Sequence, residues 1–113
     1  MDSAFFRRLR QANQIQIDNP KCVPVICKYK EGSLIFKDLS TDRIFITNKE
    51  ETILTFLIKL RKSITIPSDI SIFILLNNDM MPATTSLIGD LYYKYKSDDN
   101  FLYFNLLEEN CFG

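Results

Sequence analysis

The chain has 113 residues, of which 46% are hydrophobic and 25% charged, enough for one domain with a single buried core. Lys plus Arg and Asp plus Glu number 14 each, so the zero net charge gives no support for nucleic-acid binding, which depends on neutralising phosphates. The absence of histidine excludes Ser-His and Cys-His nucleophile activation, together with every zinc site that needs histidine.

The first predicted element is a short basic helix that ends before Pro20. Phe5, Leu9 and Ala12 recur at helical spacing, with arginines between them. We expect Phe5 and Leu9 to pack on the core while the arginines stay solvated. The alternative is that Phe5, Phe6 and the arginines touch an anionic membrane surface.

Two strands are predicted next. Residues 22–29 are rich in β-branched side chains, and Pro24 places this strand at a sheet edge or gives it a free N–H side. Residues 31–32 suggest a turn, residues 33–42 allow no prediction, and residues 43–47 favour a second strand.

The clearest helix follows. Its apolar side chains fall at i, i+3, i+4, i+7 and i+11: Ile53, Phe56, Leu57, Leu60 and Ile64. Pro67 ends it, and the N-terminal cap is predicted to be either Thr52 or a box of Thr47 with Glu50.

The last third of the chain predicts a strand, a helix and a strand. Residues 70–76 are continuous enough in apolar character for a central buried strand. A second apolar stripe runs over residues 87–95, with Thr84 or Thr85 as its predicted cap, and residues 101–107 favour the final strand.

The predicted order is therefore helix, strand, strand, helix, strand, helix, strand. It fits an α+β fold of the ubiquitin-like β-grasp type, a four-stranded mixed sheet with a crossing helix, among a few possible topologies. We divide the chain into an N-terminal helical extension (1–20), a β-grasp domain (21–108) and a flexible C-terminal tail (109–113).

Chemical sites of the chain's own are not expected. The carboxylate pairs 98–99 and 108–109 lie in predicted loop and tail, where solvation explains them, so we predict no enzyme, no cofactor and no metal site. Three cysteines without an evident secretory segment indicate reduced thiols of a cytoplasmic protein. The longest apolar run, residues 72–76, is far shorter than the roughly 20 residues that span a bilayer, so membrane attachment would have to be acquired.

Several separated blocks carry a resemblance to a known family. They are residues 19–26, 56–64, 77–78, 82–84, 91–92, 101–103 and 109–113. In this order and spacing they resemble the autophagy-related ubiquitin-like modifiers, the family of GABA-receptor-associated protein and microtubule-associated protein light chain. The likeness runs from about Phe5 to Gly113.

This resemblance implies that Gly113 is joined to the amine of phosphatidylethanolamine on autophagosomal membranes, with Phe112 recognised as part of the tail. The implied partners are ubiquitin-like activating and conjugating enzymes and a cysteine protease that processes and delipidates the protein. The chain itself is then not an enzyme. It is expected to be a cytoplasmic monomer that becomes membrane-bound when lipidated.

The resemblance also implies binding of autophagy receptors through aromatic-x-x-aliphatic peptides that add a strand to residues 43–47. The implied aromatic pocket comprises Ile15, Pro24, Ile26, Arg43, Phe45 and Phe101. The implied aliphatic pocket comprises Ile44, Ile46 and Phe56. A second docking surface would use Phe73 and Leu75. Without the resemblance, these alternating residues are more typical of a core.

The chain departs from the family pattern at several places. The loop 47–51 is one residue longer, and a register shift of one residue would exchange the two faces of the preceding strand. Glu51 or Lys59 stands where the family has an apolar residue, so we expect a shallower and more polar second pocket. Ser63 replaces an arginine. Two alternative functions stay open: a protein-conjugated autophagy modifier and a non-conjugated ubiquitin-like interaction domain.

Overall fold

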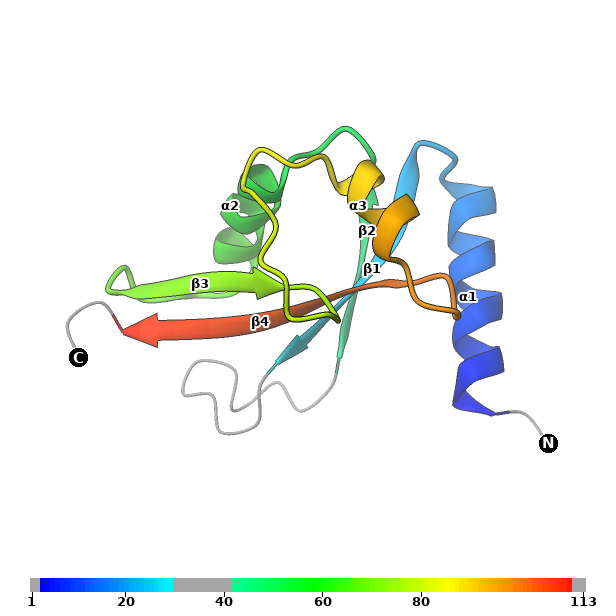
Figure 1. Ribbon diagram of the computed structural model, residues 1–113, viewed down its shortest axis with the longest axis horizontal. Helices are drawn as coiled ribbons and strands as arrows, with labels where there is room; N and C mark the ends of the chain where they lie inside the picture. The colour runs from blue at the N-terminus through cyan, green and yellow to red at the C-terminus, as the bar shows by residue number, and fades with distance from the viewer. Residues whose placement is uncertain (1–2, 30–41, 111–113) are drawn as a thin grey trace.

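The computed structural model describes residues 3–29 and 42–110, which form one mixed sheet and three helices (Figure 1). In chain order the elements are α1 (Ala4–Asp18), β1 (Cys22–Tyr29), β2 (Arg43–Asn48), α2 (Ile53–Ser63), β3 (Ile70–Leu75), α3 (Ile88–Tyr95) and β4 (Leu102–Asn110). The predicted order of elements is confirmed. The predicted turn at residues 31–32 lies outside the described residues.

The strands of the described residues lie in the order β2-β1-β4-β3. β1 pairs antiparallel with β2 and parallel with β4, and β3 pairs antiparallel with β4. This is the four-stranded mixed sheet predicted for a ubiquitin-like β-grasp domain. β4 runs through Glu109 and Asn110, which pair with Ser71 and Ile70 of β3.

One prediction about strand position is wrong. β3 lies at an edge and not at the centre, because its apolar run buries one face only: Ile72 and Ile74 are buried while Phe73 and Leu75 are half-buried. β1 is central, so of the two alternatives predicted for Pro24, a sheet edge or a free N–H side, the second is the correct one. The parallel pairing with β4 starts at Val25, so the missing N–H of Pro24 removes no bond of that ladder.

The larger core lies between the sheet and the two helices α2 and α3. α2 covers it with Ile53, Phe56 and Leu60, and Phe104 of β4 is fully buried beneath. Thr52 caps α2, since its Oγ1 accepts a 3.2 Å hydrogen bond from the amide of Thr55. Of the two predicted caps, Thr52 alone is therefore the correct one.

α3 begins without the predicted cap. Its N-cap residue is Leu87, which makes no side-chain hydrogen bond, so the prediction of Thr84 or Thr85 is wrong. The first amides of α3 instead donate to backbone carbonyls of the turn before α2: Ile88 to the Glu51 carbonyl and Gly89 to the Lys49 carbonyl, both at 2.8 Å. These contacts take the place of a local side-chain cap.

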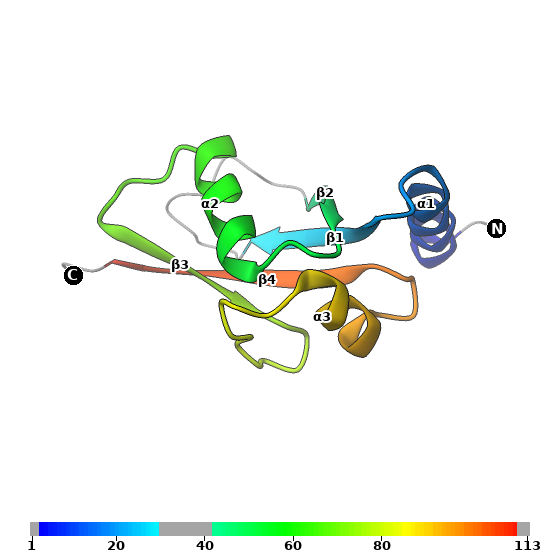
Figure 2. The same ribbon diagram turned by 90° about the horizontal axis from the view of Figure 1, so that it is seen from above.

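α1 covers a smaller core at the end of the sheet away from α2, as Figures 1 and 2 show. Ala12 is the only residue of α1 that is fully buried, and Leu9 is half-buried. Phe5 is 43% exposed and Phe6 53%, so the expectation that Phe5 packs on the core is wrong. Polar bonds also hold α1, including one of 2.9 Å from the Asn100 amide group to the Asn13 side chain.

Candidate functional site

The outer edge of β2 is the candidate site. β2 pairs with β1 on one side, and no strand of the described residues pairs with its other side. Ile44 is 40% exposed and Ile46 51% exposed, which is unusual for isoleucines on a strand at an open edge. An edge with free backbone groups and apolar side chains is a template for another strand.

One face of β2 is turned toward α1, and we call it the α1 flank. Ile44 lies opposite Ile26 and Ile46 opposite Pro24, so these four side chains share a face of the sheet. On the same face Ile26 packs with Phe101, Ala12 and the half-buried Ile15. Pro24, Ile26 and Phe101 are buried, so Ile44 and Ile46 provide most of the exposed apolar surface.

A series of side-chain hydrogen bonds joins α1 to β4 and to Asp42, the residue before β2. The Arg8 guanidinium donates to the Tyr103 hydroxyl at 3.0 Å and to the Asp42 carboxylate at 3.1 Å. The Tyr103 hydroxyl in turn donates to Asp99. Burial, with the hydrogen bond and charge of Asp99, raises the pKa of Tyr103 to about 12, while Arg8 acts in the opposite direction. The hydroxyl therefore stays protonated and serves as a structural link.

The other face of β2 is turned toward α2, and we call it the α2 flank. Phe45 lies on it, with its ring centroid 5.4 Å from that of Phe56, which is 5.2 Å from Phe104. The predicted grouping of Arg43 and Phe45 with Pro24 is thus wrong, as is that of Ile44 and Ile46 with Phe56. The cause is the one-residue register shift, because side chains of a strand alternate between faces.

Arg43 on the α2 flank lies opposite Cys27 of β1. Burial raises the pKa of the Cys27 thiol, and the charge of Arg43 opposes that rise. Burial also raises the pKa of Tyr29, which Arg43 again opposes. Arg43 therefore lies on the same face as Cys27 and, contrary to the prediction, does not line the aromatic pocket with Pro24. Cys27 stays a thiol, which makes it a poor nucleophile.

An ion pair occupies the α2 flank. The Lys59 ammonium lies 2.5 Å from Oε1 of Glu51, whose side chain is 7% exposed, against 68% for Lys59. Among the described residues, no hydrogen-bond donor other than Lys59 reaches this oxygen.

The ion pair lies on the side of α2 that faces β2. Arg61 reaches the Ile70 carbonyl of β3, and Lys59 and Arg61 lie about 200° apart around a helix of 3.6 residues per turn. Since β2 and β3 are opposite edges of the sheet, Lys59 is on the β2 side. Glu51 and Lys59 are the two residues on which the prediction of a more polar second pocket rests.

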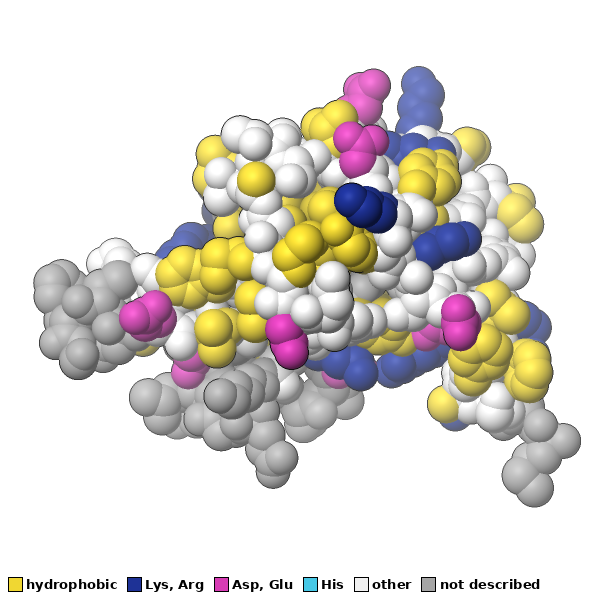
Figure 3. All heavy atoms as spheres, viewed as in Figure 1, with side chains coloured by type: hydrophobic (Ala, Val, Ile, Leu, Met, Phe, Trp, Pro, Cys, Tyr) yellow, Lys and Arg dark blue, Asp and Glu magenta, His cyan; other side chains and the backbone are white. Residues whose placement is uncertain are grey.

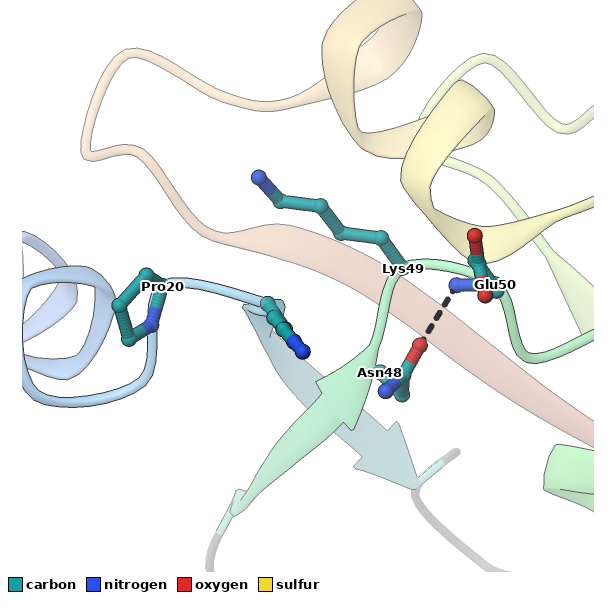
Figure 4. A pocket seen from close by; sticks show the side chains of 5 residues that line it. Pro20, Asn48, Lys49 and Glu50 are labelled. Atoms are coloured by element: carbon teal, nitrogen blue, oxygen red, sulfur yellow. Dashed lines mark hydrogen bonds between the residues drawn. The ribbon is translucent and has the colours of Figure 1, made fainter.

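The turn after β2 fixes where Glu51 lies. The Glu50 amide donates to Oδ1 of Asn48 at 2.8 Å, as Figure 4 shows. Both residues line a polar hollow of about 310 Å³, together with Pro20 and Lys49. A β-carbon on Gly89 would stand 2.8 Å from the Lys49 carbonyl oxygen, so only glycine allows this close approach. The turn is therefore packed tightly on α3.

Comparison with known proteins agrees with this geometry. The family model described as "Autophagy protein Atg8 ubiquitin like" matches residues 7–113. The chain belongs to the Atg8 family. It is 37% identical over 109 residues to autophagy-related protein 8 of Pichia angusta, covering 96% of this chain and 85% of that protein. With the Candida albicans protein of the same name the identity is 36%, covering 96% and 78%.

A solved structure supports the same assignment. The crystal structure of Trypanosoma brucei ATG8 matches with a TM-score of 0.81 and 27% identity, covering all of this chain and 95% of that one. The chain is thus an autophagy-related ubiquitin-like protein, and its homologues are modifiers rather than enzymes. Partners of the ubiquitin-like conjugation pathway and autophagy receptors follow from the family in general terms.

In this Atg8-family chain, the predicted second docking surface lies on the outer strand β3. Phe73 pairs with Leu107 and Leu75 with Asn105, so both predicted residues share the face that is turned away from α2. Leu75 and Lys28 line a hollow of about 370 Å³ there. The structure brings Phe73 and Leu75 side by side, on the opposite edge of the sheet from β2.

A further apolar hollow lies beside α3. Its volume is about 360 Å³ and its lining includes Met80, Met81, Pro82, Leu87, Leu91 and Tyr95. Figure 3, which has the same view as Figure 1, shows hydrophobic side chains gathered between the positions of α2 and α3. The sequence analysis did not single out this hollow, because its residues come from a loop and a helix that only the fold brings together.

Other predictions concern sites outside the sheet edges. Phe112 and Gly113 lie outside the described residues. Within residues 3–29 and 42–110, no group of three metal-binding side chains occurs. In the same part of the chain, no helix is both long and apolar enough to cross a bilayer.

Proposed function

We propose that this Atg8-family chain is a ubiquitin-like modifier whose β2 edge receives extended peptides with an aromatic anchor, as aromatic-x-x-aliphatic motifs of autophagy receptors have. The observation that carries this proposal is the open edge of β2 with its two exposed isoleucines, Ile44 and Ile46. Backbone bonds to β2 would supply affinity, and the α1 flank would hold the aromatic side chain.

The site residues follow from the faces of β2. The aromatic side chain rests on Ile44 and Ile46, with Ile15 beside them and the buried Pro24, Ile26 and Phe101 beneath. Phe45 and Phe56 stabilise the opposite face and do not contact this anchor. Phe73 and Leu75, on the far edge strand, are proposed as a separate docking surface.

Calorimetry with a short aromatic-x-x-leucine peptide tests this site. Binding is expected, and replacing the aromatic residue of the peptide by alanine should weaken it about tenfold or more, the equivalent of about 1.4 kcal/mol. Ile46→Asp should have a similar effect because it places a charge under the aromatic ring. Ile17→Asp is the matched control, since Ile17 is 72% exposed on α1. Equal affinity for Ile46→Asp and the intact chain would exclude the β2 edge.

Conjugation is proposed at Gly113. Its support is the family match, which extends through residue 113. An activating enzyme adenylates the Gly113 carboxylate with ATP and releases pyrophosphate. A cysteine thiol then displaces AMP to form a thioester, and the acyl group is passed to a cysteine of the conjugating enzyme. The amine of phosphatidylethanolamine displaces that thiol and forms an amide. Phe112, in the tail that follows β4, is proposed to be recognised by these enzymes, and a cysteine protease would hydrolyse the amide.

Reconstitution with activating and conjugating enzymes, ATP and phosphatidylethanolamine liposomes tests conjugation. The expected result is a gel-mobility shift that is lost when Gly113 is deleted. A shift only when an acceptor protein is added would favour the protein-conjugated modifier. No shift with any acceptor would favour a non-conjugated interaction domain. The proposed location is the cytoplasm, with membrane attachment of the monomer after lipidation.

A further inference from the structure

A strand added to β2 presents its side chains to both flanks in turn. Successive side chains of a strand point to opposite faces, so two side chains three positions apart lie on opposite faces. If the aromatic anchor rests on Ile44 and Ile46, the residue three positions later reaches the α2 flank. There it meets the ion pair of Glu51 and Lys59.

We infer that the Glu51–Lys59 pair makes this second position polar, so that preferred ligands carry a glutamine or asparagine there instead of an aliphatic residue. The inference rests on the proposed peptide-binding function and names the side-chain class of its ligands. Glu51 and Lys59 are then the specificity-determining residues of the site.

The argument against an aliphatic side chain is the water it would displace. The Lys59 side chain is 68% exposed, and an apolar group laid on it removes hydration without offering an acceptor. The Glu51 carboxylate is already nearly buried, with Lys59 as its partner, so displacing Lys59 would leave an uncompensated charge. The pair must stay intact when a ligand binds.

An amide side chain suits the pair because the pair offers one hydrogen-bond acceptor, Glu51, and one donor, Lys59. A charged ligand residue would be attracted by one member of the pair and repelled by the other. A carboxamide is neutral and carries both donors and an acceptor, so it can donate to the carboxylate and accept from the ammonium. The backbone of Glu51 is also fixed: its carbonyl accepts from the Ile88 amide at 2.8 Å, and its amide donates to the Asn48 carbonyl at 3.0 Å.

The test uses calorimetry with three peptides that share the aromatic anchor and differ three positions later, as leucine, alanine or glutamine. With the intact chain, the glutamine peptide should bind about threefold tighter than the other two, the size of one net hydrogen bond. In Glu51→Leu/Lys59→Leu the order should reverse, with leucine about tenfold tighter than glutamine. Asp90→Leu/Lys94→Leu is the matched control, because it removes one acid and one base from exposed positions of α3.

Each outcome separates the inference from the function on which it rests. If none of the three peptides binds the intact chain, the proposed function fails. If the leucine peptide binds the intact chain tenfold tighter than the alanine peptide, only the inference is overturned. Should the double leucine variant not fold, Glu51→Gln/Lys59→Gln decides: it keeps the shape of both side chains, and an unchanged preference for glutamine in that variant would show that charge plays no part.

Discussion

The two flanks of β2 belong to one strand but are built differently. The α2 flank continues into the main core through Phe45, Phe56 and Phe104, and an ion pair covers its outer side. The α1 flank rests on a small cluster around Ile26 and is fastened by polar bonds such as that of Arg8 with Tyr103. Its apolar side chains, Ile44 and Ile46, face solvent.

This difference separates the tasks of stability and recognition. Side chains on the α2 flank are expected to contribute chiefly to the free energy of unfolding, since burial of large apolar groups is the main stabilising term. Side chains on the α1 flank contribute little to the core and remain available to a partner. One face of β2 can thus stabilise the fold while the other face binds a partner.

Truncation of Phe56 should break the α2 flank. Phe56 is 3% exposed and packs on both Phe45 and Phe104, so Phe56→Ala should lower the free energy of unfolding by about 3–5 kcal/mol, measured by urea denaturation. Leu54→Ala on the same helix is the control, because Leu54 is 52% exposed. Equal losses for both variants would contradict the assignment of this flank to the core.

A methyl group at Gly89 should disturb the turn that carries Glu51. Gly89→Ala places its β-carbon 2.8 Å from the Lys49 carbonyl oxygen, and the backbone must move to relieve the contact. The expected loss is about 1–3 kcal/mol, seen as a lower thermal midpoint. Lys94→Ala, an exposed change on the same helix, should stay within about 0.5 kcal/mol of the intact chain. A thermal midpoint for Gly89→Ala as high as that of the control would mean that the turn can accommodate a β-carbon at this position.

The N-terminal caps of α2 and α1 should contribute differently to the free energy of unfolding. Thr52→Ala removes the hydrogen bond to the Thr55 amide and should cost about 1 kcal/mol in urea unfolding. Ser3→Ala removes the corresponding bond of 3.3 Å at the exposed start of α1 and should cost less. Thr52→Ser is expected to restore most of the loss. The reverse ranking, with Ser3 costing more, would show that α1 and not α2 governs stability.

Loss of the Arg8 bonds should loosen α1 alone. Arg8→Ala removes the donors to the buried Tyr103 and to Asp42. Because the Arg8 and Asp42 side chains are 36% and 33% exposed, the expected cost is about 1 kcal/mol or less. Amide hydrogen exchange should become about fivefold faster in α1 and stay unchanged in α2. Arg7→Ala, at an exposed position of the same helix, is the control. Faster exchange in both helices would mean that the two flanks are not independent.

Much of the fold could be predicted because its signals are local. The apolar stripe of Ile53, Phe56 and Leu60, the cap at Thr52 and the stop at Pro67 all act within one helix. The positions of β1 and β3 in the sheet could not be predicted, because Pro24 and the apolar run 70–76 are properties of one strand each and do not show which strands lie beside it. Edge or centre is decided by pairing partners that are distant in the chain.

The candidate site shows the same limit. The residues of the β2 edge could be named from the sequence, but their division between flanks depended on register, and a shift of one residue exchanges Phe45 with Ile44. The pairing of Glu51 with Lys59 was also beyond a pattern of residue types. The two stand eight residues apart, and the turn that aims Glu51 at Lys59 is held by contacts with α3.

Three properties could be read from the order of residues alone: the order of elements, the lack of histidine chemistry and, through its separated blocks, membership of the Atg8 family. These follow from local periodicity and residue type, which any unfolded stretch already contains. The tertiary structure decided which face of β2 is buried, which strands stand at the edges, and that an ion pair lies on the α2 flank. Those features depend on register and on contacts between distant residues, which exist only once the sheet has formed.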